Sequence, residues 1–215
     1  WLRHTGHNAE VLARRQVAQG ALLADGGFAY VYSAVDVRTG EPLALRRVRL
    51  QDAEALRAAR EEVALLQRLK PHPHVVRFLG AEVRATEAVE LFELCTGGTL
   101  LARLSAGSHG CPCLSEAETL EVLGGLASAL AFLHRTGIVH YDVKSENVLK
   151  GADALWKLGD FGSASERTLD LSNAPRRAVL EAEEFVHGRC TPIYRAPELA
   201  DVYLRWPIGP KADIF

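Results

Sequence analysis

The sequence lacks several features that would assign it to particular classes of protein. It has no methionine, and its four cysteines are too few and too unevenly spaced for a disulfide framework: Cys95, Cys111, Cys113 and Cys190. No hydrophobic run approaches the roughly 18 residues that span a bilayer. The net charge of −2 offers no basic field for nucleic acid and no polybasic patch for a membrane. We therefore expect an intracellular, cytoplasmic protein with no nucleic-acid partner and no direct membrane insertion.

The ends of the sequence also lack familiar signals. The chain opens on Trp1 without a signal-peptide pattern, and it stops at "KADIF", where an apolar segment is starting. We therefore expect a fragment of something longer. The balance of 48% hydrophobic and 24% charged residues is that of a folded globular chain, and no internal repeat is present.

The first half of the chain has the pattern of a strand-rich unit. "VLARRQVAQGALLA" and "AYVYSAVDV" flank Gly26 and Gly27, and "LALRRVRL" follows the turn "RTGEP", so an antiparallel meander is predicted. Between Ala53 and Leu69 apolar residues recur every three or four positions, which predicts an amphipathic helix. "VVRFLGAEV" and "AVELFELC" supply two more strands, and "TGG" follows as a hinge.

The second half is predicted to begin with a helix. Ser115 and Glu118 form a capping box at its start, and Gly137 marks its end. Two short strand-like pieces, "NVLK" and "LWKLGDFG", come next. Residues 163–195 show no strong period, so we expect an ordered loop that carries a short helix around "RRAVLEAEEF".

The segment "IVHYDVKSENVL", residues 138–149, concentrates polar residues between two apolar runs. Together with "LADGGFAYV", "ALR", Glu62, "DFG" and "TPIYRAPE" in this order, it makes the sequence resemble the eukaryotic protein kinases over nearly its whole length. The resemblance implies an α+β, bilobal, protein-kinase-like fold. Residues 1–95 would form the N-lobe, a five-stranded antiparallel sheet with one helix. Residues 96–215 would form a mainly helical C-lobe, truncated after the activation segment.

The resemblance assigns roles within the second half. Phosphoryl transfer depends on positioning and on neutralising charge. Asp142 matches the base that accepts the substrate hydroxyl's proton, and Lys144 matches the lysine that reaches the γ-phosphate in Ser/Thr kinases. Asn147 and Asp160 match the ligands of Mg²⁺, and their hard oxygens suit that ion. Thr191 matches a threonine that Ser/Thr kinases place near the catalytic aspartate and lysine, here Asp142 and Lys144. The alternative is a solvated polar loop. His140 is interpreted as a packed structural histidine and not as an acid or base.

The resemblance assigns ATP binding to the first half. The residues that match the family's nucleotide-binding positions are Ala24, Gly26, Ala29, Val31, Ala44, Glu93 and Cys95. Ala24 and Ala29 stand where other kinases have glycine, whereas Gly26 has no Cβ to obstruct a phosphate. The alternative for Gly26–Gly27 is a plain hairpin. Phe92 matches the gatekeeper position behind adenine, or it is ordinary core.

Arg46 is the most serious departure from the family pattern. It stands where kinases have the strand lysine that holds the α- and β-phosphates and pairs with the helix glutamate, here Glu62. Arginine presents a wide planar fork in place of a compact ammonium, so we expect weak catalysis. Lysine is scarce, the first being Lys70, and Arg47 points to the opposite face of its strand. A milder interpretation is a general preference for arginine; likewise Glu62 could belong to a solvated helix face.

A second departure is Tyr141, where many kinases have an arginine that binds a phosphorylated activation loop. We therefore predict that loop phosphorylation is not the main switch by that route. The segment "HGCPC" brings His109, Cys111 and Cys113 together, but a zinc site usually needs a second ligand pair. An exposed loop is the favoured interpretation there.

Subfamily motifs refine the resemblance. "LADGGFAYVY", "FELC", "DFGSA", "TPIYRAPEL" and "PIGPKADIF" are similar to the Numb-associated kinase family, which includes cyclin-G-associated and adaptor-associated kinases. The resemblance implies an ATP- and Mg²⁺-dependent Ser/Thr kinase that acts on protein substrates, clathrin adaptor proteins among them, in endocytosis. The alternative, favoured by Arg46 and Tyr141, is a pseudokinase that binds nucleotide or partners without transferring phosphate.

Overall fold

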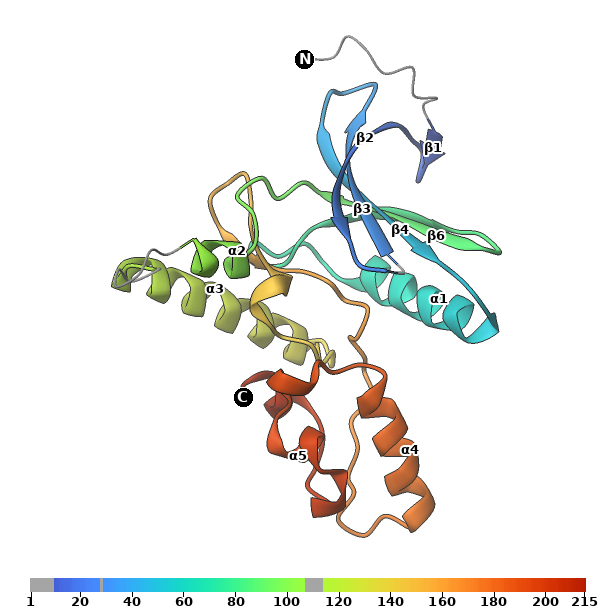
Figure 1. Cartoon of the computed structure of the whole chain (residues 1–215), viewed down its shortest axis with the longest axis vertical. Coiled ribbons are helices and arrows are strands. Elements are labelled where there is room, and N and C mark those ends of the chain that lie inside the picture. Colours follow the sequence, from blue (N-terminus) through green and yellow to red (C-terminus); the bar gives the residue numbers. More distant parts are fainter. Residues whose placement is uncertain (1–9, 28, 107–113) are drawn as a thin grey trace. The chain divides into compact units, whose positions relative to one another are not determined.

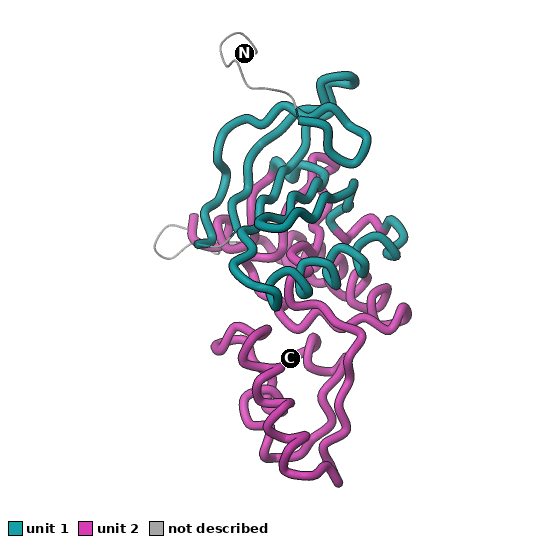
Figure 2. The backbone as a smooth tube through the Cα atoms, turned by 90° about the vertical axis from the view of Figure 1, so that its right-hand side faces the viewer, with its two compact units in different colours: residues 1–71, 76–96 teal, residues 72–75, 97–215 magenta. Residues whose placement is uncertain are grey.

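The computed structural model describes residues 10–27, 29–106 and 114–215, and the chain divides into two compact units (Figure 2). Unit 1 comprises Trp1–Pro71 and Val76–Thr96, and unit 2 comprises His72–Val75 and Gly97–Phe215. Unit 1 is an antiparallel sheet with one helix, and unit 2 is mainly helical, so the predicted α+β class is confirmed. Among the described residues no helix is both long and apolar enough to cross a membrane.

The sheet of unit 1 has six antiparallel strands in the order β1-β2-β3-β4-β6-β5 (Figure 1). Its strands are β1 (Glu10–Leu12), β2 (Arg15–Asp25), β3 (Ala29–Asp36), β4 (Pro42–Arg49), β5 (Phe78–Val83) and β6 (Glu87–Glu93). The sequence predicted five strands, because Ala13 and Arg14 carry no turn signal. Both residues have positive φ, 48° and 67°, and form a two-residue hairpin loop that splits the first predicted strand. Such loops normally use Asn or Gly.

The helix of unit 1, α1 (Ala53–Arg68), forms where the apolar period predicted it. Asp52 caps its start by accepting a hydrogen bond from the Ala55 N–H at 2.8 Å. The buried face consists of Ala59, Val63, Leu65 and Leu66. The helix ends just before Pro71, which cannot continue its hydrogen bonding.

Alternation along β4 gives the two faces of the sheet different characters. Leu43 and Leu45 point to one face and belong to a buried apolar cluster: Leu12, Val17, Ala34, Leu43, Leu45, Val89 and Leu91. Arg46 points to the other face, because successive side chains of a strand alternate. The antiparallel register sets Arg46 opposite Glu90 of β6. Arg46 and Glu90 therefore lie on the face of the sheet that packs against α1, and not on a face open to water.

Unit 2 contains the helices α2 (Leu100–Ser105), α3 (Glu116–Arg135), α4 (Arg176–His187) and α5 (Pro197–Ala200), and a two-stranded sheet of β7 (Val148–Lys150) and β8 (Trp156–Leu158). The predicted capping box of Ser115 and Glu118 is present, and Gly137 follows α3 with a φ of 81°. The short helix expected near "RRAVLEAEEF" is α4. Helix α2, capped by Thr99, was not predicted, because six residues are too few to show a period.

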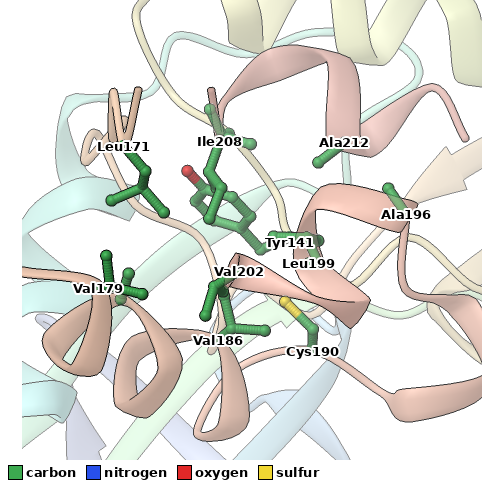
Figure 3. Close-up of a cluster of buried hydrophobic side chains, with 12 residues drawn as sticks. Tyr141, Leu171, Val179, Val186, Cys190, Ala196, Leu199, Val202, Ile208 and Ala212 are labelled. Atoms are coloured by element: carbon green, nitrogen blue, oxygen red, sulfur yellow. The ribbon is translucent and has the colours of Figure 1, made fainter. Parts of the chain in front are cut away.

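One buried apolar cluster of unit 2 packs α4 and α5 against the loop that follows α3. We call it the Tyr141 cluster (Figure 3), and it comprises Val139, Tyr141, Leu171, Val179, Ala182, Val186, Cys190, Ala196, Leu199, Val202, Ile208 and Ala212. Its members come from two separate stretches of the sequence, residues 139–141 and residues 171–212. The cluster therefore fixes residues 163–195 against the loop that carries the predicted base.

Candidate active site

The buried carboxylate of Asp213 anchors the loop that follows α3. Its oxygens accept the backbone N–H groups of His140 and Tyr141 at 2.8 Å each, and His134 Nε2 lies 2.8 Å from one of them. Two consecutive N–H groups bound to one carboxylate fix the turn immediately before Asp142. Sequence reasoning missed Asp213, although its place in the short motif "KADIF" marked it as a charge within an apolar stretch.

Three of the predicted residues form a closed hydrogen-bonded set at Asp142. Lys144 Nζ lies 2.7 Å from Asp142 Oδ2, and Thr191 Oγ1 donates to Asp142 Oδ1 at 2.6 Å. Lys144 Nζ also donates to Thr191 Oγ1 at 2.8 Å, and the Thr191 N–H donates to Asp142 Oδ1 at 3.1 Å. The structure thus brings together a carboxylate, an ammonium and a hydroxyl from positions almost fifty residues apart in the sequence.

The environment of Asp142 keeps its carboxylate ionised. Burial raises the pKa of Asp142, but hydrogen bonds from Lys144 and Thr191 outweigh burial and hold the pKa below its ordinary value. A buried carboxylate with charged and neutral donors is stable as the anion. Asp142 is therefore an anionic acceptor at neutral pH, as a group that receives or orients a hydroxyl proton must be.

Asn147 and Asp160 are the two residues that the resemblance assigns to Mg²⁺. Asn147 Nδ2 donates to the backbone oxygen of Asp142 at 2.9 Å, which turns the amide nitrogen toward the loop. The Gly159 N–H donates to the Asn147 backbone oxygen at 2.8 Å, so Asp160 follows a residue that is bonded to Asn147. Asp160 is exposed and has a φ of 56°. His140 is fully buried and bonds the Gly159 oxygen at 3.0 Å, as a packed histidine does.

This pair fits a magnesium ion better than a softer metal. An amide oxygen and a carboxylate are hard ligands, and Mg²⁺ commonly takes only one or two protein carboxylates and fills its shell with water and phosphate. Within residues 10–27, 29–106 and 114–215, no three His, Cys, Asp or Glu side chains gather as a metal site. His109, Cys111 and Cys113, which we weighed as zinc ligands, lie outside the described residues.

Arg46 is held by two carboxylates, of which the sequence predicted one. Its Nη1 donates to Glu62 Oε1 at 2.6 Å and to Glu90 Oε2 at 2.8 Å. The side chains of Arg46, Glu62 and Glu90 are 19%, 11% and 0% exposed, so the set is largely withdrawn from water. Glu90 was missed, although a lone acidic residue in the apolar run "AVELF" was a signal. Arg47 lies on the opposite face and bonds Glu10 and Glu87, as the alternation requires.

The remaining predicted nucleotide-binding residues also lie in unit 1. Val31 and Ala44 share the face of Arg46, because cross-strand partners point to the same side. Ala24 and Gly26 are exposed, and the Gly26 N–H donates to the Ala29 oxygen at 2.9 Å, which closes the hairpin. An added Cβ at Gly26 would lie 3.2 Å from that oxygen.

The residues predicted to contact adenine and the predicted gatekeeper lie at or just after the end of β6. Glu93 Oε1 accepts the Arg77 N–H at 2.8 Å, and the Glu93 N–H donates to the Arg77 oxygen at 3.0 Å. Cys95 is half-buried. The Phe92 ring meets Phe78 edge-on with centroids 5.5 Å apart, so it packs within unit 1.

Comparisons with known proteins show the family of the chain. A family model described as protein kinase domain matches residues 17–215. The chain is 33% identical over 204 residues to a probable serine/threonine-protein kinase of Dictyostelium discoideum, covering 90% of this chain and 18% of that protein. It is 31% identical over 240 residues to the serine/threonine-protein kinase AKL1 of Saccharomyces cerevisiae, covering 99% and 21%.

A third relative carries a different kinase description. The MAP kinase kinase kinase SSK2 of Saccharomyces cerevisiae is 37% identical over 167 residues, covering 76% of this chain and 10% of that protein. The chain therefore spans about a fifth or less of the length of these three relatives.

Proposed function

The chain belongs to the protein kinase domain family, and from this premise we propose that it transfers the γ-phosphate of ATP to Ser or Thr hydroxyls of protein substrates. The observation that carries the proposal is the closed set of Asp142, Lys144 and Thr191, with distances of 2.6 to 2.8 Å between the interacting atoms. The set has an acceptor for a hydroxyl proton beside a cation for a phosphate.

Each residue has a definite task in this reaction. The substrate oxygen forms a bond to the γ-phosphorus while the bond from that phosphorus to the β-phosphate oxygen breaks, and ADP leaves. Asp142 accepts the proton of the attacking hydroxyl, and Lys144 balances the charge of the moving phosphoryl group. Asn147 and Asp160 would hold Mg²⁺, which when bound neutralises phosphate charge. Thr191 keeps the Asp142 carboxylate oriented through two hydrogen bonds to Oδ1.

The subfamily and the substrates form a finer part of the proposal. We propose membership of the Numb-associated kinase family, clathrin adaptor proteins as substrates, a role in endocytosis and a cytoplasmic location. The support is the set of motifs "DFGSA", "TPIYRAPEL" and "PIGPKADIF". Phosphorylation of a purified clathrin adaptor subunit compared with an unrelated Ser-rich protein tests the substrate. Equal rates on both would contradict the adaptor assignment.

The general activity is tested by transfer from labelled ATP. The full-length protein should phosphorylate Ser/Thr peptides but not Tyr peptides, and Asp142→Asn should remove the transfer, because the amide cannot accept the proton. Asp201→Asn is the matched control, because Asp201 is an exposed carboxylate that caps a short turn outside the site. Transfer that survives Asp142→Asn would show that Asp142 is not the base.

A second candidate function is a pseudokinase, and the environment of Arg46 favours it. Arg46 is bonded to two carboxylates of unit 1, so its guanidinium is already engaged within that unit. A pseudokinase of this kind would bind ATP or a partner without transferring phosphate. The two functions separate by experiment. A melting temperature raised by ATP, with or without Mg²⁺, and no transfer under any condition would establish the second.

A further inference from the structure

Tyr141 occupies the position next to the predicted base in an unusual backbone conformation. Its φ is 64°, which is uncommon for a bulky aromatic residue and is maintained only where surrounding contacts determine it. The side chain is 4% exposed, and the backbone N–H is held by Asp213 Oδ1 at 2.8 Å. In many kinases the arginine at this position binds a phosphate on the activation loop. Tyr141 instead packs its side chain into the buried Tyr141 cluster.

The Tyr141 side chain joins the loop to residues 163–195 at several points. Its hydroxyl donates to the Arg167 backbone oxygen at 2.5 Å, and its ring meets the edge of Phe185 with centroids 5.3 Å apart. Around the ring lie buried members of the Tyr141 cluster, such as Leu171 and Val186 (Figure 3). The Tyr141 side chain thus contacts the beginning of residues 163–195 at Arg167 and the C-terminal part of α4 at Phe185.

Two arginine side chains near Tyr141 also make their contacts within residues 163–195. The guanidinium groups of Arg167 and Arg189 lie 5.0 and 4.9 Å from the Phe185 ring centroid. Arg189 Nη1 donates to the Ser163 oxygen at 3.1 Å, and Ser163 Oγ donates to the Arg189 oxygen at 2.6 Å. These bonds tie the two ends of the segment together through backbone oxygens.

The cluster adjoins the catalytic hydrogen bond from both sides. Tyr141 precedes Asp142, and the buried cluster member Cys190 precedes Thr191. Asp142 and Thr191 are the two partners of the 2.6 Å hydrogen bond. A change in how Tyr141 packs therefore displaces both ends of that bond, because interiors are packed densely and transmit such shifts.

We propose that Tyr141 is a positioning residue: through its hydroxyl and its contact with Phe185 it holds residues 163–195 in the arrangement that joins Thr191 to Asp142, without phosphorylation of that segment. The proposal rests on the proposed kinase function, which it deepens by naming the regulation of the same site. A cluster of buried apolar side chains takes the place of an ion pair between arginine and phosphate.

The first test compares phosphatase-treated and untreated full-length protein. Treated wild type should keep its kcat within about twofold, because apolar packing and a hydrogen bond to a backbone oxygen hold Tyr141 to the segment. Tyr141→Phe should lower kcat by about fivefold to tenfold, the effect of one lost buried hydrogen bond, and leave the KM for ATP unchanged. Tyr203→Phe is the matched control, because this exposed hydroxyl bonds Glu183 outside the cluster. A tenfold loss on phosphatase treatment, or equal kcat for Tyr141→Phe and wild type, overturns the proposal.

The second test does not depend on activity, so it separates this proposal from the proposed function. Trypsin can cut after Arg176 and Arg177, which are exposed at the start of α4. At a temperature where all variants are folded, Tyr141→Phe and Phe185→Leu should be cut several times faster there than phosphatase-treated wild type or Tyr203→Phe. Equal rates overturn the proposal even if the protein transfers no phosphate. Protection with no transfer in any state would leave the positioning role intact and refute the kinase function.

Discussion

The two units differ in how they use their central cation. In unit 2, the ammonium of Lys144 meets one carboxylate, Asp142, and the pair has no net charge. In unit 1, the guanidinium of Arg46 meets two carboxylates, Glu62 and the fully buried Glu90. A second carboxylate beside a cation reduces the positive potential that the cation offers to a phosphate. Unit 2 therefore leaves Lys144 beside Asp142, whereas unit 1 places Arg46 between two buried or largely buried carboxylates.

Removing the cation of unit 1 should produce the largest loss of stability. Arg46→Met removes the guanidinium that bonds the fully buried Glu90 at 2.8 Å, and breaking a buried ion pair typically costs about 3–5 kcal/mol. Urea unfolding of the full-length protein measures the loss. Arg49→Met on the same strand is the control, because Arg49 is exposed and lies over the Tyr30 ring. An equal loss for both variants would show that Arg46 is not a structural cation.

Removing the cation of unit 2 should instead reduce the rate. Lys144→Met should lower kcat on the order of 10²- to 10³-fold, as the loss of one preorganised electrostatic contact does. Stability should fall by only about 1 kcal/mol, because Thr191 still donates two hydrogen bonds to Asp142. The exposed Lys211, changed to Met, is the control.

The same variant should also change the pH dependence of activity. Lys144 helps to lower the pKa of Asp142, so its removal raises that pKa and moves the acid limb of kcat/KM to higher pH. An acid limb that stays in place would argue that a group other than Asp142 controls it.

These two cations also show what could be predicted from the sequence. Asp142, Lys144 and Asn147 lie within one short loop, so a local motif was sufficient to group them. The capping box of Ser115 and the apolar period of α1 were local signals as well. The partnership of Arg46 with Glu90 depends on which residues face each other across β4 and β6, and residue order alone does not specify that register.

The packing of Tyr141 could not be predicted from the sequence for a related reason. Its neighbours lie 26 to about 70 residues away and meet it only when residues 163–195 fold back on the loop. The sequence predicted from the resemblance that phosphorylation would not act through this position, but it could not show what replaces the phosphate. The hairpin at Ala13 and Arg14 was missed because its turn has neither Asn nor Gly.

A double substitution sharpens the comparison of the two cations. Arg46→Lys alone should change kcat/KM for ATP little, because a single ammonium would still face Glu62 and Glu90. With Glu90→Leu added, the ammonium faces one carboxylate fewer, and kcat/KM should rise about tenfold. Glu82→Leu, an exposed strand glutamate, is the control substitution. An equal gain from Arg46→Lys alone would show that Glu90 does not govern the cation.

The smallest expected effect comes from the exposed ion pairs of unit 1, where Arg47 and Arg84 each bridge Glu10 and Glu87. Burial raises the pKa of Glu10, but the two guanidinium groups outweigh it and hold that pKa below the ordinary value of 4.5. The pairs therefore contribute stability fully above that value, and the contribution is lost as the pH falls through the lower folded-state pKa.

Because these groups are about a quarter to a third exposed, Glu10→Gln should cost less than about 1 kcal/mol at pH 7, and 1 M salt should reduce the difference. The exposed Glu121 of α3, changed to Gln, is the control. Thermal melts at pH 7 and pH 3 measure both. A Glu10→Gln loss that stayed the same at pH 3 and in high salt would mean that packing, not charge, accounts for it, and would remove the distinction between the exposed pairs and the buried set at Arg46.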